Sequence, residues 1–300
     1  IKGDNISITD CNISNSGNVG VNIGGYDIDI QNNTMINNQV SIHVTLGFSV
    51  SMDDNRINYG SDGIGIYRSE ECSITDNRIG NQTYYGIEIS SSSRITIALN
   101  DISNNRNGIY SNNDNTVEIG GNAIHDNEES GVHGRSSDHF WIHDNTLYDN
   151  DDAINLYWSS DNWDIVDNSI NNCRNGVNIQ MYSRYIHVEG NNITDCDGSG
   201  VLVMRTNSVT IKENILDGNF IHGVDAEDSH SLDVFDNEIT GNNNGLDISD
   251  GSNVKVYNNT ISRNSDGVFL SNMYDVSFFN NTVSYNENHG LILTTSNRNT

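Results

Sequence analysis

The chain has 300 residues, of which 34% are hydrophobic, and it contains 27 glycines and no proline. Its 41 acidic residues outnumber 14 lysines and arginines, so the formal net charge is −27. A surface this acidic repels phosphate groups, so we expect neither a nucleic-acid partner nor binding to anionic membranes. The chain has no run of about 18 apolar residues, the length that a membrane span needs. We therefore expect no membrane insertion.

An asparagine recurs every 22 or 23 residues through the chain. These ladder asparagines are Asn33, Asn55, Asn77, Asn100, Asn122, Asn145, Asn168, Asn191, Asn214, Asn237, Asn259 and Asn281. An I-x-I pattern ends three positions before each of them, and a Gly-apolar-x-apolar segment follows about eight to ten positions after it. A period this short and regular is typical of a repeat protein, in which each unit buries its apolar stripe against its neighbours.

Each repeat is predicted to form three strands, as residues 72–90 illustrate. Cys72 and Ile74 point inward on a first strand, Asn77 turns the corner, Ile79 belongs to a short second strand, and 86–89 form a third. Thirteen such coils fit the chain, beginning at residue 6. Leucine-rich repeats share part of the pattern, but β-branched alternation in both halves of the repeat favours strands over helices.

The ladder asparagines have a structural role in this interpretation. Identical amides on successive coils can hydrogen-bond to one another and to a tight backbone bend, and Asn tolerates the left-handed backbone that such a bend needs. Cys173 and Cys196 share a second ladder position in consecutive coils. We expect two buried thiols in contact there, with a disulfide as the alternative.

The repeat resembles the right-handed parallel β-helix family, the pectin-lyase-like superfamily with NosD-type (PbH1) repeats, over essentially the whole chain. The resemblance implies an all-β solenoid of about 13 coils with three strands each. The family includes polygalacturonase-like hydrolases, polysaccharide lyases, archaeal disaggregatase-like surface enzymes and adhesins, so it does not settle the reaction. It favours an extracellular or cell-surface location. We interpret 1–300 as one domain of a longer chain, because both ends lie in mid-coil.

Function is expected on side chains that point outward, and the unusual ones gather in coils six to ten. Trp141, Trp158 and Trp163 fall within 23 residues there, whereas the outer coils present small, neutral or apolar side chains. Aromatic and polar residues together predict a groove for a polysaccharide. The predicted substrate-binding residues are His139, Trp141, Asn155, Tyr157, Trp158, Asn178, Gln180, Arg184, His187, Arg205, Asp225 and Glu227.

A pair of aspartates inside this groove is the main catalytic candidate. Asp151 and Asp152 are similar to the paired aspartates of polygalacturonase-like hydrolases, although the other motifs of those enzymes are missing. With Glu129 (or Glu128) one coil earlier, they could divide proton donation and water activation. The net charge favours hydrolysis slightly, because lyases need a strongly anionic polymer.

Two alternatives remain open. A lyase or C5-epimerase acting on a uronic-acid polymer would use His133 as base, Arg135 as carboxylate neutraliser and Tyr157 as proton donor. No cofactor is required, but Ca²⁺ is an option because carboxylates on successive coils offer oxygen ligands. These carboxylates belong to Asp225, Glu227, Asp228 and Asp247. The second alternative is a non-catalytic adhesin or carbohydrate-binding β-helix. The sequence does not predict the oligomeric state.

Overall fold

The computed structural model describes residues 3–294 and 297–299, and all regular structure in them is β-strand. It confirms a parallel β-solenoid of about 13 coils. The chain divides by internal contacts into two compact units, residues 1–150 and 151–300, which are described separately below. A helix able to span a membrane does not occur in the described part of the chain.

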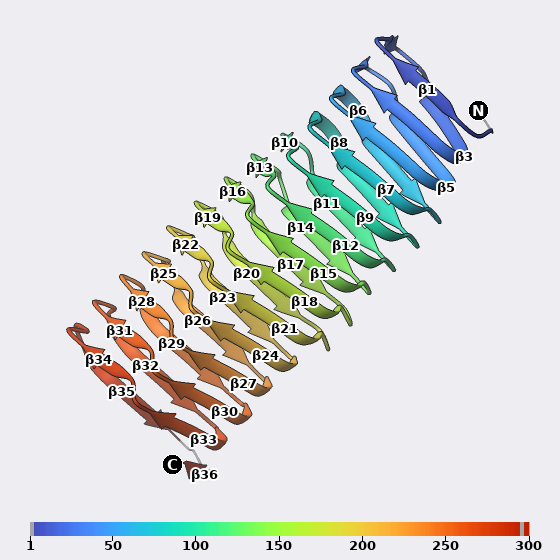
Figure 1. Ribbon diagram of the computed structural model, residues 1–300. Coiled ribbons are helices and arrows are strands. Elements are labelled where there is room, and N and C mark those ends of the chain that lie inside the picture. The colour runs from blue at the N-terminus through green and yellow to red at the C-terminus, as the bar shows by residue number, and fades with distance from the viewer. Residues whose placement is uncertain (1–2, 295–296, 300) are drawn as a thin grey trace. The chain divides into compact units, whose positions relative to one another are not determined.

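The first unit stacks its strands in parallel, each against the equivalent strand of the next coil (Figure 1). In four cases, one long strand carries two consecutive segments of the coil. The strands are β1 (Ile6–Thr9), β2 (Asn12–Ser14), β3 (Val19–Gln31), β4 (Thr34–Ile36), β5 (Val40–Asp53), β6 (Arg56–Tyr67), β7 (Glu70–Thr75), β8 (Arg78–Ser90), β9 (Ser93–Ala98), β10 (Asp101–Ser103), β11 (Asn107–Asn112), β12 (Asn115–Gly120), β13 (Ala123–His125), β14 (Ser130–Arg135), β15 (Asp138–His143) and β16 (Thr146–Tyr148).

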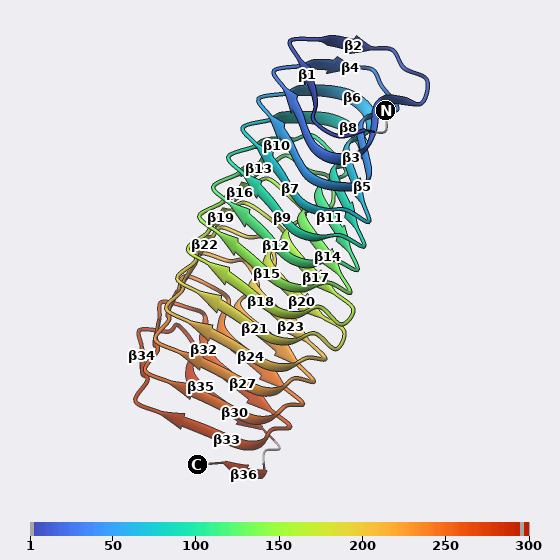
Figure 2. The ribbon, with the colours of Figure 1, turned by 45° about the vertical axis from the view of Figure 1, so that its right-hand side comes forward.

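The second unit repeats the same three-strand coil, and its short second strands form one stack in Figure 2. Its strands are β17 (Asp152–Tyr157), β18 (Asp161–Val166), β19 (Ser169–Asn171), β20 (Asn175–Gln180), β21 (Arg184–Glu189), β22 (Asn192–Thr194), β23 (Ser199–Met204), β24 (Asn207–Lys212), β25 (Ile215–Asp217), β26 (His222–Glu227), β27 (His230–Phe235), β28 (Glu238–Thr240), β29 (Asn244–Ser249), β30 (Ser252–Tyr257), β31 (Thr260–Ser262), β32 (Asp266–Ser271), β33 (Tyr274–Phe279), β34 (Thr282–Ser284), β35 (His289–Thr294) and β36 (Asn297–Asn299).

The interior consists of the inward-pointing residues that the period-two alternation predicted. Cys72, Ile74, Ile79, Ile87 and Ile89 are all buried, each 2% exposed or less. Because each first and third strand contributes two or more such residues, each short second strand contributes one, and every strand stacks on its equivalent, each coil covers the apolar stripe of the coil before it. The fold thus needs few hydrophobic residues per coil.

The ladder asparagines make the hydrogen bonds expected of them. In the first unit, the Asn55 side-chain amide donates to Asn77 Oδ1 over 3.0 Å, and the Asn55 backbone N–H donates to the same oxygen over 2.9 Å. The Asn77 amide in turn donates to the Met52 carbonyl over 2.9 Å. Each side chain therefore ties the bend of its own coil to the coils on both sides.

The left-handed backbone at this bend belongs to a different residue from the one expected. The residue immediately before the ladder asparagine has the positive φ, as at Asp54 (50°), Asp76 (54°) and Leu99 (59°). The ladder asparagine itself is absent from the positive-φ residues. Asn is thus required at the ladder position for its side-chain amide, and the tolerance of a left-handed backbone is required one position earlier.

The second ladder contains the two thiols as expected. Cys173 and Cys196 are buried, and no disulfide joins them. Burial, together with the neighbouring Cys173, raises the pKa of the Cys196 thiol to about 12. The Cys196 N–H still donates to Asn219 Oδ1 over 3.2 Å, so the backbone keeps its bond to the amide ladder beyond it.

A third ladder, built mainly from hydroxyl groups, follows the turn after each third strand. The repeat pattern of the sequence did not reveal this ladder. Ser69 N–H donates to Ser92 Oγ, Ser92 N–H donates to Asp114 Oδ1, and Asp114 N–H donates to Ser137 Oγ. Asp114 thus carries a carboxylate where its neighbours carry hydroxyls. Burial raises its pKa to about 6 even though Ser111 and two backbone N–H groups donate to it.

Removing one ladder amide should destabilise the second unit. Asn191 accepts two bonds from Asn168 and donates to Asn214 Oδ1 and to the Ile165 and Glu189 carbonyls. Asn191→Ala leaves several of these buried groups unpaired, so we expect a loss of about 4 kcal/mol in the free energy of unfolding. Chemical denaturation followed by circular dichroism measures it. The adjacent exposed residue supplies the control, because Asn192→Ala should change stability by less than about 0.5 kcal/mol.

Asp114 should make stability depend on pH in a defined window. Its pKa is raised to about 6 in the folded state, from the ordinary aspartate value of about 3.9 in the unfolded chain. The folded state therefore holds the proton more tightly, so this contribution is complete below pH 4 and is lost as pH rises through 6. The difference between the folded and unfolded pKa of Asp114 corresponds to about 3 kcal/mol in the free energy of unfolding. Asp114→Asn removes this titration, and the stability of the variant relative to wild type should rise between pH 4 and pH 7. Parallel stability curves would contradict the assignment.

Candidate functional site

The third strands of the first unit bring one outward column of side chains into register. His43 on β5 pairs with Gly65 on β6, Gly65 pairs with Glu88 on β8, and the column continues to Tyr110 and His133 on β11 and β14. Gly65 therefore leaves a gap between a histidine and a glutamate. Because parallel strands lie about 4.8 Å apart, that gap is wide enough for one side chain from a neighbouring position.

The ring of Tyr67 fills this gap. A Cβ atom at Gly65 would lie 2.7 Å from Tyr67 Cε2, so only glycine leaves room for the ring. The Tyr67 hydroxyl donates a hydrogen bond to the carboxylate of Glu88. On its other side, the ring lies 4.9 Å from the imidazole of His43, between ring centroids. His43, Asp62, Tyr67 and Glu88 are together named the Tyr67–Glu88 cluster.

Asp62 completes the cluster from the position before the strand glycine. Its Oδ1 accepts a hydrogen bond of 3.3 Å from the Tyr85 backbone N–H, and its Oδ2 accepts one of 3.3 Å from the Ser61 hydroxyl. Asp62 and Glu88 are both half-buried. The Tyr67–Glu88 cluster contains no lysine or arginine. No cationic side chain of the cluster therefore stabilises the ionised form of either carboxyl group.

Burial shifts every titratable group of the Tyr67–Glu88 cluster towards its neutral form. It raises the pKa of Glu88, with a further increase from the charge of Asp62 and a partial offset from the Tyr67 hydrogen bond. Burial likewise raises the pKa of Asp62 and of Tyr67, and it lowers the pKa of His43. Such a concentration of shifted groups on one outward face is the usual mark of acid–base chemistry.

Aromatic rings continue the same face beyond Glu88. Tyr85 and Tyr110 stack with centroids 4.7 Å apart, and Tyr110 stacks on His133 at 5.3 Å. Because stacked rings cover one another's faces, they present edges and polar atoms to solvent. A sugar lying here would contact hydroxyl and imidazole groups.

The predicted residues of the first unit fall on two different strands of the coil. Glu129 is bound by Arg106 and by the Asn107 amide, and these hydrogen bonds lower its pKa although burial opposes them. Arg135 ends β14 and is exposed. On β15, Trp141 is 47% exposed and stacks on His143 at 3.6 Å, while His139 is exposed with φ 57°. The cluster that includes Tyr67 contains none of them.

Asp152 in the second unit is buried in a hydrogen-bond network. Its side chain is 3% exposed. Its carboxylate accepts from the side-chain nitrogens of Asn155 (3.1 Å), Arg174 (3.3 Å), Asn175 (2.8 Å) and Asn178 (2.7 Å). With four donors and almost no exposure, this carboxylate orients its neighbours and offers no free oxygen to a ligand. Asp151 is more exposed and pairs with Arg174 Nε at 3.1 Å.

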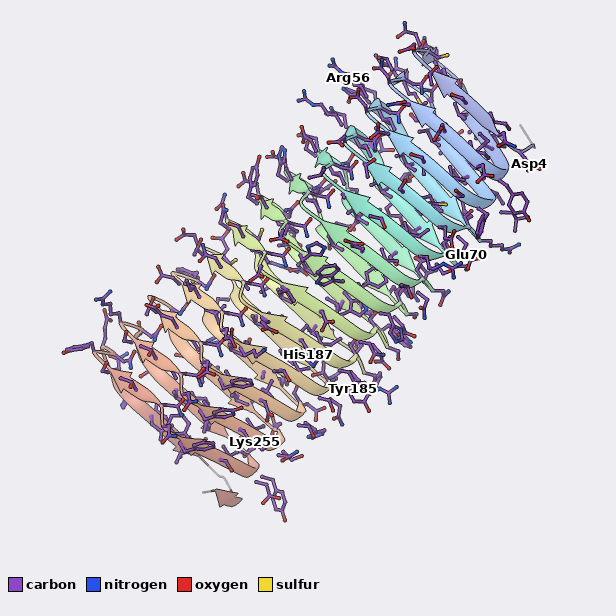
Figure 3. The ribbon with its side chains drawn as sticks, viewed as in Figure 1. Asp4, Arg56, Glu70, Tyr185, His187 and Lys255 are labelled. Atoms are coloured by element: carbon purple, nitrogen blue, oxygen red, sulfur yellow. The ribbon has the colours of Figure 1, made fainter. Side chains whose placement is uncertain are left out.

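Several other predicted residues of the second unit already have protein partners. Asn178 is buried, and its Oδ1 accepts a hydrogen bond of 2.7 Å from Gln180. Arg184 binds Asp161. His187 lies on the outer face of β21 (Figure 3), and its Nδ1 is 2.8 Å from Oδ1 of Asp164 on β18. Their side chains would have to exchange these partners for a ligand.

Tryptophan exposure differs from the expectation at one position. Trp163 is fully buried and is the largest side chain of the interior, so it does not belong to an aromatic binding surface. It points inward because it precedes the outward Asp164 on β18. Trp158, in contrast, is 49% exposed and lies with Tyr157 at the end of β17, ring centroids 6.1 Å apart.

A second acidic group lies on β26 and β29. Asp225 and Asp247 face each other in register, and His222 Nε2 lies 4.0 Å and 3.8 Å from their carboxylates. Burial raises the pKa of Asp225, with His222 acting against it and Asp247 adding to it. Glu227 is exposed at the end of β26. Among the described residues, no group of three or more His, Cys, Asp or Glu is placed to hold a metal ion. Binding of Ca²⁺ stays an untested alternative.

The sequence matches the family model for the right handed beta helix region over residues 1–113, 86–234 and 223–300. The chain belongs to this family. No curated protein matches it in sequence.

Among solved structures it is similar to the periplasmic alginate epimerase AlgG (TM-score 0.66, 13% identity, covering 93% of this chain and 78% of that one). It is also similar to the A-module of Azotobacter vinelandii mannuronan C-5 epimerase AlgE6 (TM-score 0.62, 14% identity, covering 97% of this chain and 91% of that one). A third similar structure is a PL6 alginate lyase in complex with a trisaccharide (TM-score 0.65, 11% identity, covering 98% of this chain and 79% of that one). At these identities the likeness shows the shared fold alone.

His43, Asp62, Tyr67 and Glu88 were not among the residues predicted from the sequence. The chemistry was predicted in coils six to ten, and that stays a prediction; the outer columns were taken as small, neutral or apolar, although they carry these four titratable side chains. The available signal was a glycine at one outward position between a histidine and a glutamate, each about one period away. Such a glycine on an outward column marks a space that a neighbouring side chain can enter.

A structural role of Asp152 can be separated from a catalytic one. In Asp152→Asn an NH₂ group faces buried donors, so we expect a loss of about 3 kcal/mol in the free energy of unfolding. Denaturation measures it. The control Asp151→Asn should cost less than about 1 kcal/mol, because its ion pair is more exposed. Unchanged stability of Asp152→Asn together with lost turnover would instead support the catalytic hypothesis.

Proposed function

We propose that this protein is a polysaccharide-acting enzyme that hydrolyses glycosidic bonds at the Tyr67–Glu88 cluster. One observation carries the proposal. A half-buried carboxyl group with a raised pKa, that of Glu88, accepts a hydrogen bond from a phenol and lies near a second carboxyl group. A general acid held neutral by burial, with a second carboxylate nearby, is the arrangement that glycoside hydrolysis needs.

The roles follow from the environments. Glu88, whose pKa is raised by burial and by the charge of Asp62, keeps its proton to higher pH and donates it to the glycosidic oxygen. Asp62 then activates the attacking water, or attacks the sugar itself. Tyr67 fixes the orientation of the Glu88 carboxyl group. His43, whose pKa burial lowers, stays neutral and holds the ring of Tyr67 from the other side.

Elimination or C5-epimerisation of a uronic-acid polymer is the second candidate. The pairing of His43 with Tyr67 favours it, because a neutral imidazole beside a protonated phenol supplies both a base and a proton donor. The alginate epimerases and the alginate lyase among the similar structures agree with this candidate without deciding for it.

The remaining predicted residues are proposed as contacts for the same kind of substrate. Exposed Trp141 and Trp158 offer apolar surface to sugar rings. An extended polysaccharide substrate places the protein outside the cell or at its surface. The rival hypothesis, a non-catalytic carbohydrate-binding β-helix, differs in requiring no acid–base pair.

Substitution of Glu88 should strongly reduce turnover without affecting the fold. On a polysaccharide panel we expect wild-type protein to release new reducing ends without the ultraviolet absorbance of an unsaturated uronate. Glu88→Gln should lower kcat about 100-fold or more, since general acid catalysis supplies at least that factor. Tyr67→Phe keeps the ring and should lower kcat about tenfold, equivalent to one hydrogen bond.

The matched control is Glu238→Gln on β28, an exposed glutamate outside the cluster, which should leave kcat unchanged. New reducing ends accompanied by ultraviolet absorbance would assign elimination. Conversion of the sugar without cleavage, seen by proton NMR, would assign epimerisation. Glycan binding with no conversion of any polysaccharide would support the non-catalytic rival, and full activity of Glu88→Gln would remove Glu88 from the mechanism.

A further inference from the structure

A separate cavity of about 370 Å³ lies in the second unit, at the turns that join third strands to the first strands of the following coils. Its lining includes Tyr182, Arg184, Arg205, Asn207, Asp228 and His230. The volume is sufficient for one or two sugar rings. None of the side chains of the Tyr67–Glu88 cluster contributes to it.

The backbone of these turns directs side chains away from the interior. Tyr182, Arg205 and Asp228 have φ of 70°, 54° and 49°, so each sits at a left-handed corner where the chain reverses between strands. The turns stack from coil to coil, as shown by the Tyr182 N–H donating to the Arg205 carbonyl over 2.8 Å. The cavity is therefore built on paired backbone and does not depend on a free loop.

The two arginines of the cavity differ in their partners. Arg184 binds Asp161 through its backbone N–H (2.8 Å), Nε (3.2 Å) and Nη2 (2.8 Å), so its charge is already matched. Arg205 has no ion-pair partner among the residues that the structure describes, and its guanidinium is exposed. In a chain where acidic residues outnumber basic ones 41 to 14, an unmatched guanidinium facing a cavity is unusual.

Other arginines without an ion pair in the described ranges show that the absence of a partner alone is not enough. These are Arg56, Arg68, Arg135 and Arg263. Arg205 differs from them because it lines this cavity. A guanidinium presents a planar fork of N–H donors that matches a carboxylate with two parallel hydrogen bonds.

The rest of the lining suits a polyol ring. The Tyr182 ring is 64% exposed and offers an apolar face. Asn207 Oδ1 accepts a hydrogen bond of 2.9 Å from Ser208, which leaves the amide N–H groups to donate. Asp228 and His230 lie 3.9 Å apart, and His230 Nδ1 is 2.9 Å from Ser252 Oγ. Acceptor, donor and aromatic groups thus surround the free guanidinium.

We propose that this cavity is a binding site for a sugar unit that carries a carboxylate, a hexuronate. Arg205 binds the carboxylate through two hydrogen bonds, Asn207 and Asp228 bind ring hydroxyls, and Tyr182 packs against the ring. The net charge of −27 opposes an anionic ligand at long range, but at physiological salt charges beyond about 8 Å are largely screened. The nearby guanidinium of Arg205 then determines the attraction of an anionic ligand, and the site prefers a sugar that carries a carboxylate.

The test measures binding of the methyl glycoside of galacturonic acid by calorimetry or saturation-transfer NMR, with methyl galactoside and acetate as matched probes. We expect the uronate to bind at least tenfold more tightly than either. Arg205→Gln should weaken uronate binding tenfold or more, about 1.4 kcal/mol. Arg263→Gln is the control, because Arg263 is also exposed and has a similar φ of 59°. It should change the dissociation constant less than twofold.

The outcomes separate this site from the proposed reaction. Glu88→Gln should leave uronate binding intact, and Arg205→Gln should keep its thermal unfolding midpoint, so loss of binding cannot come from the cluster or from misfolding. Equal binding of galactoside would overturn the carboxylate assignment, and equal binding of acetate would overturn the sugar assignment. No uronate binding, or equal effects of Arg205→Gln and Arg263→Gln, would overturn the proposal altogether.

Discussion

The hydrogen bond between one buried asparagine amide and the next is the interaction on which the rest of the structure depends. It requires a spacing of one coil, and each side chain also binds backbone of its own bend and of the preceding coil, as Asn77 does with Thr75 and Met52. Coils that differ by a residue in length, 22 or 23, therefore still meet in register. Because the ladder fixes the corners, the strands between them need only alternate inward and outward.

Register at the corners is what makes side chains one period apart into neighbours on the outer face. His43, Gly65 and Glu88 are far apart in sequence, yet the strand pairing sets them side by side. The same pairing brings Asp225 against Asp247. A solenoid can thus assemble an acid–base group from single residues in successive coils, and a missing side chain in the column is as informative as a reactive one.

The fold could be predicted from the sequence almost completely, because a fixed period of amides and β-branched residues admits few other structures. The candidate site could not. Alternation tells which way Asp152 and Asn178 leave the strand, but it does not show that neighbouring amides and Arg174 cover them. Nor does it show that Tyr67 turns sideways over Gly65. Trp163 was counted with the exposed aromatic residues because tryptophan is rare in this chain. The alternation already predicted that its side chain points inward.

The thiols of the second ladder have a mechanical consequence. Neither Cys173 nor Cys196 has a side-chain amide to donate to the next coil, although the side chains of Asn219, Asn242 and Asn264 resume the ladder. In a one-dimensional stack, cohesion is a sum over neighbouring coils, so the interface with the weakest sum separates first. Under load or heat, the second unit would then part at the coils of β19 and β22, and the hydrogen-bonded coils beyond them would stay together as a block.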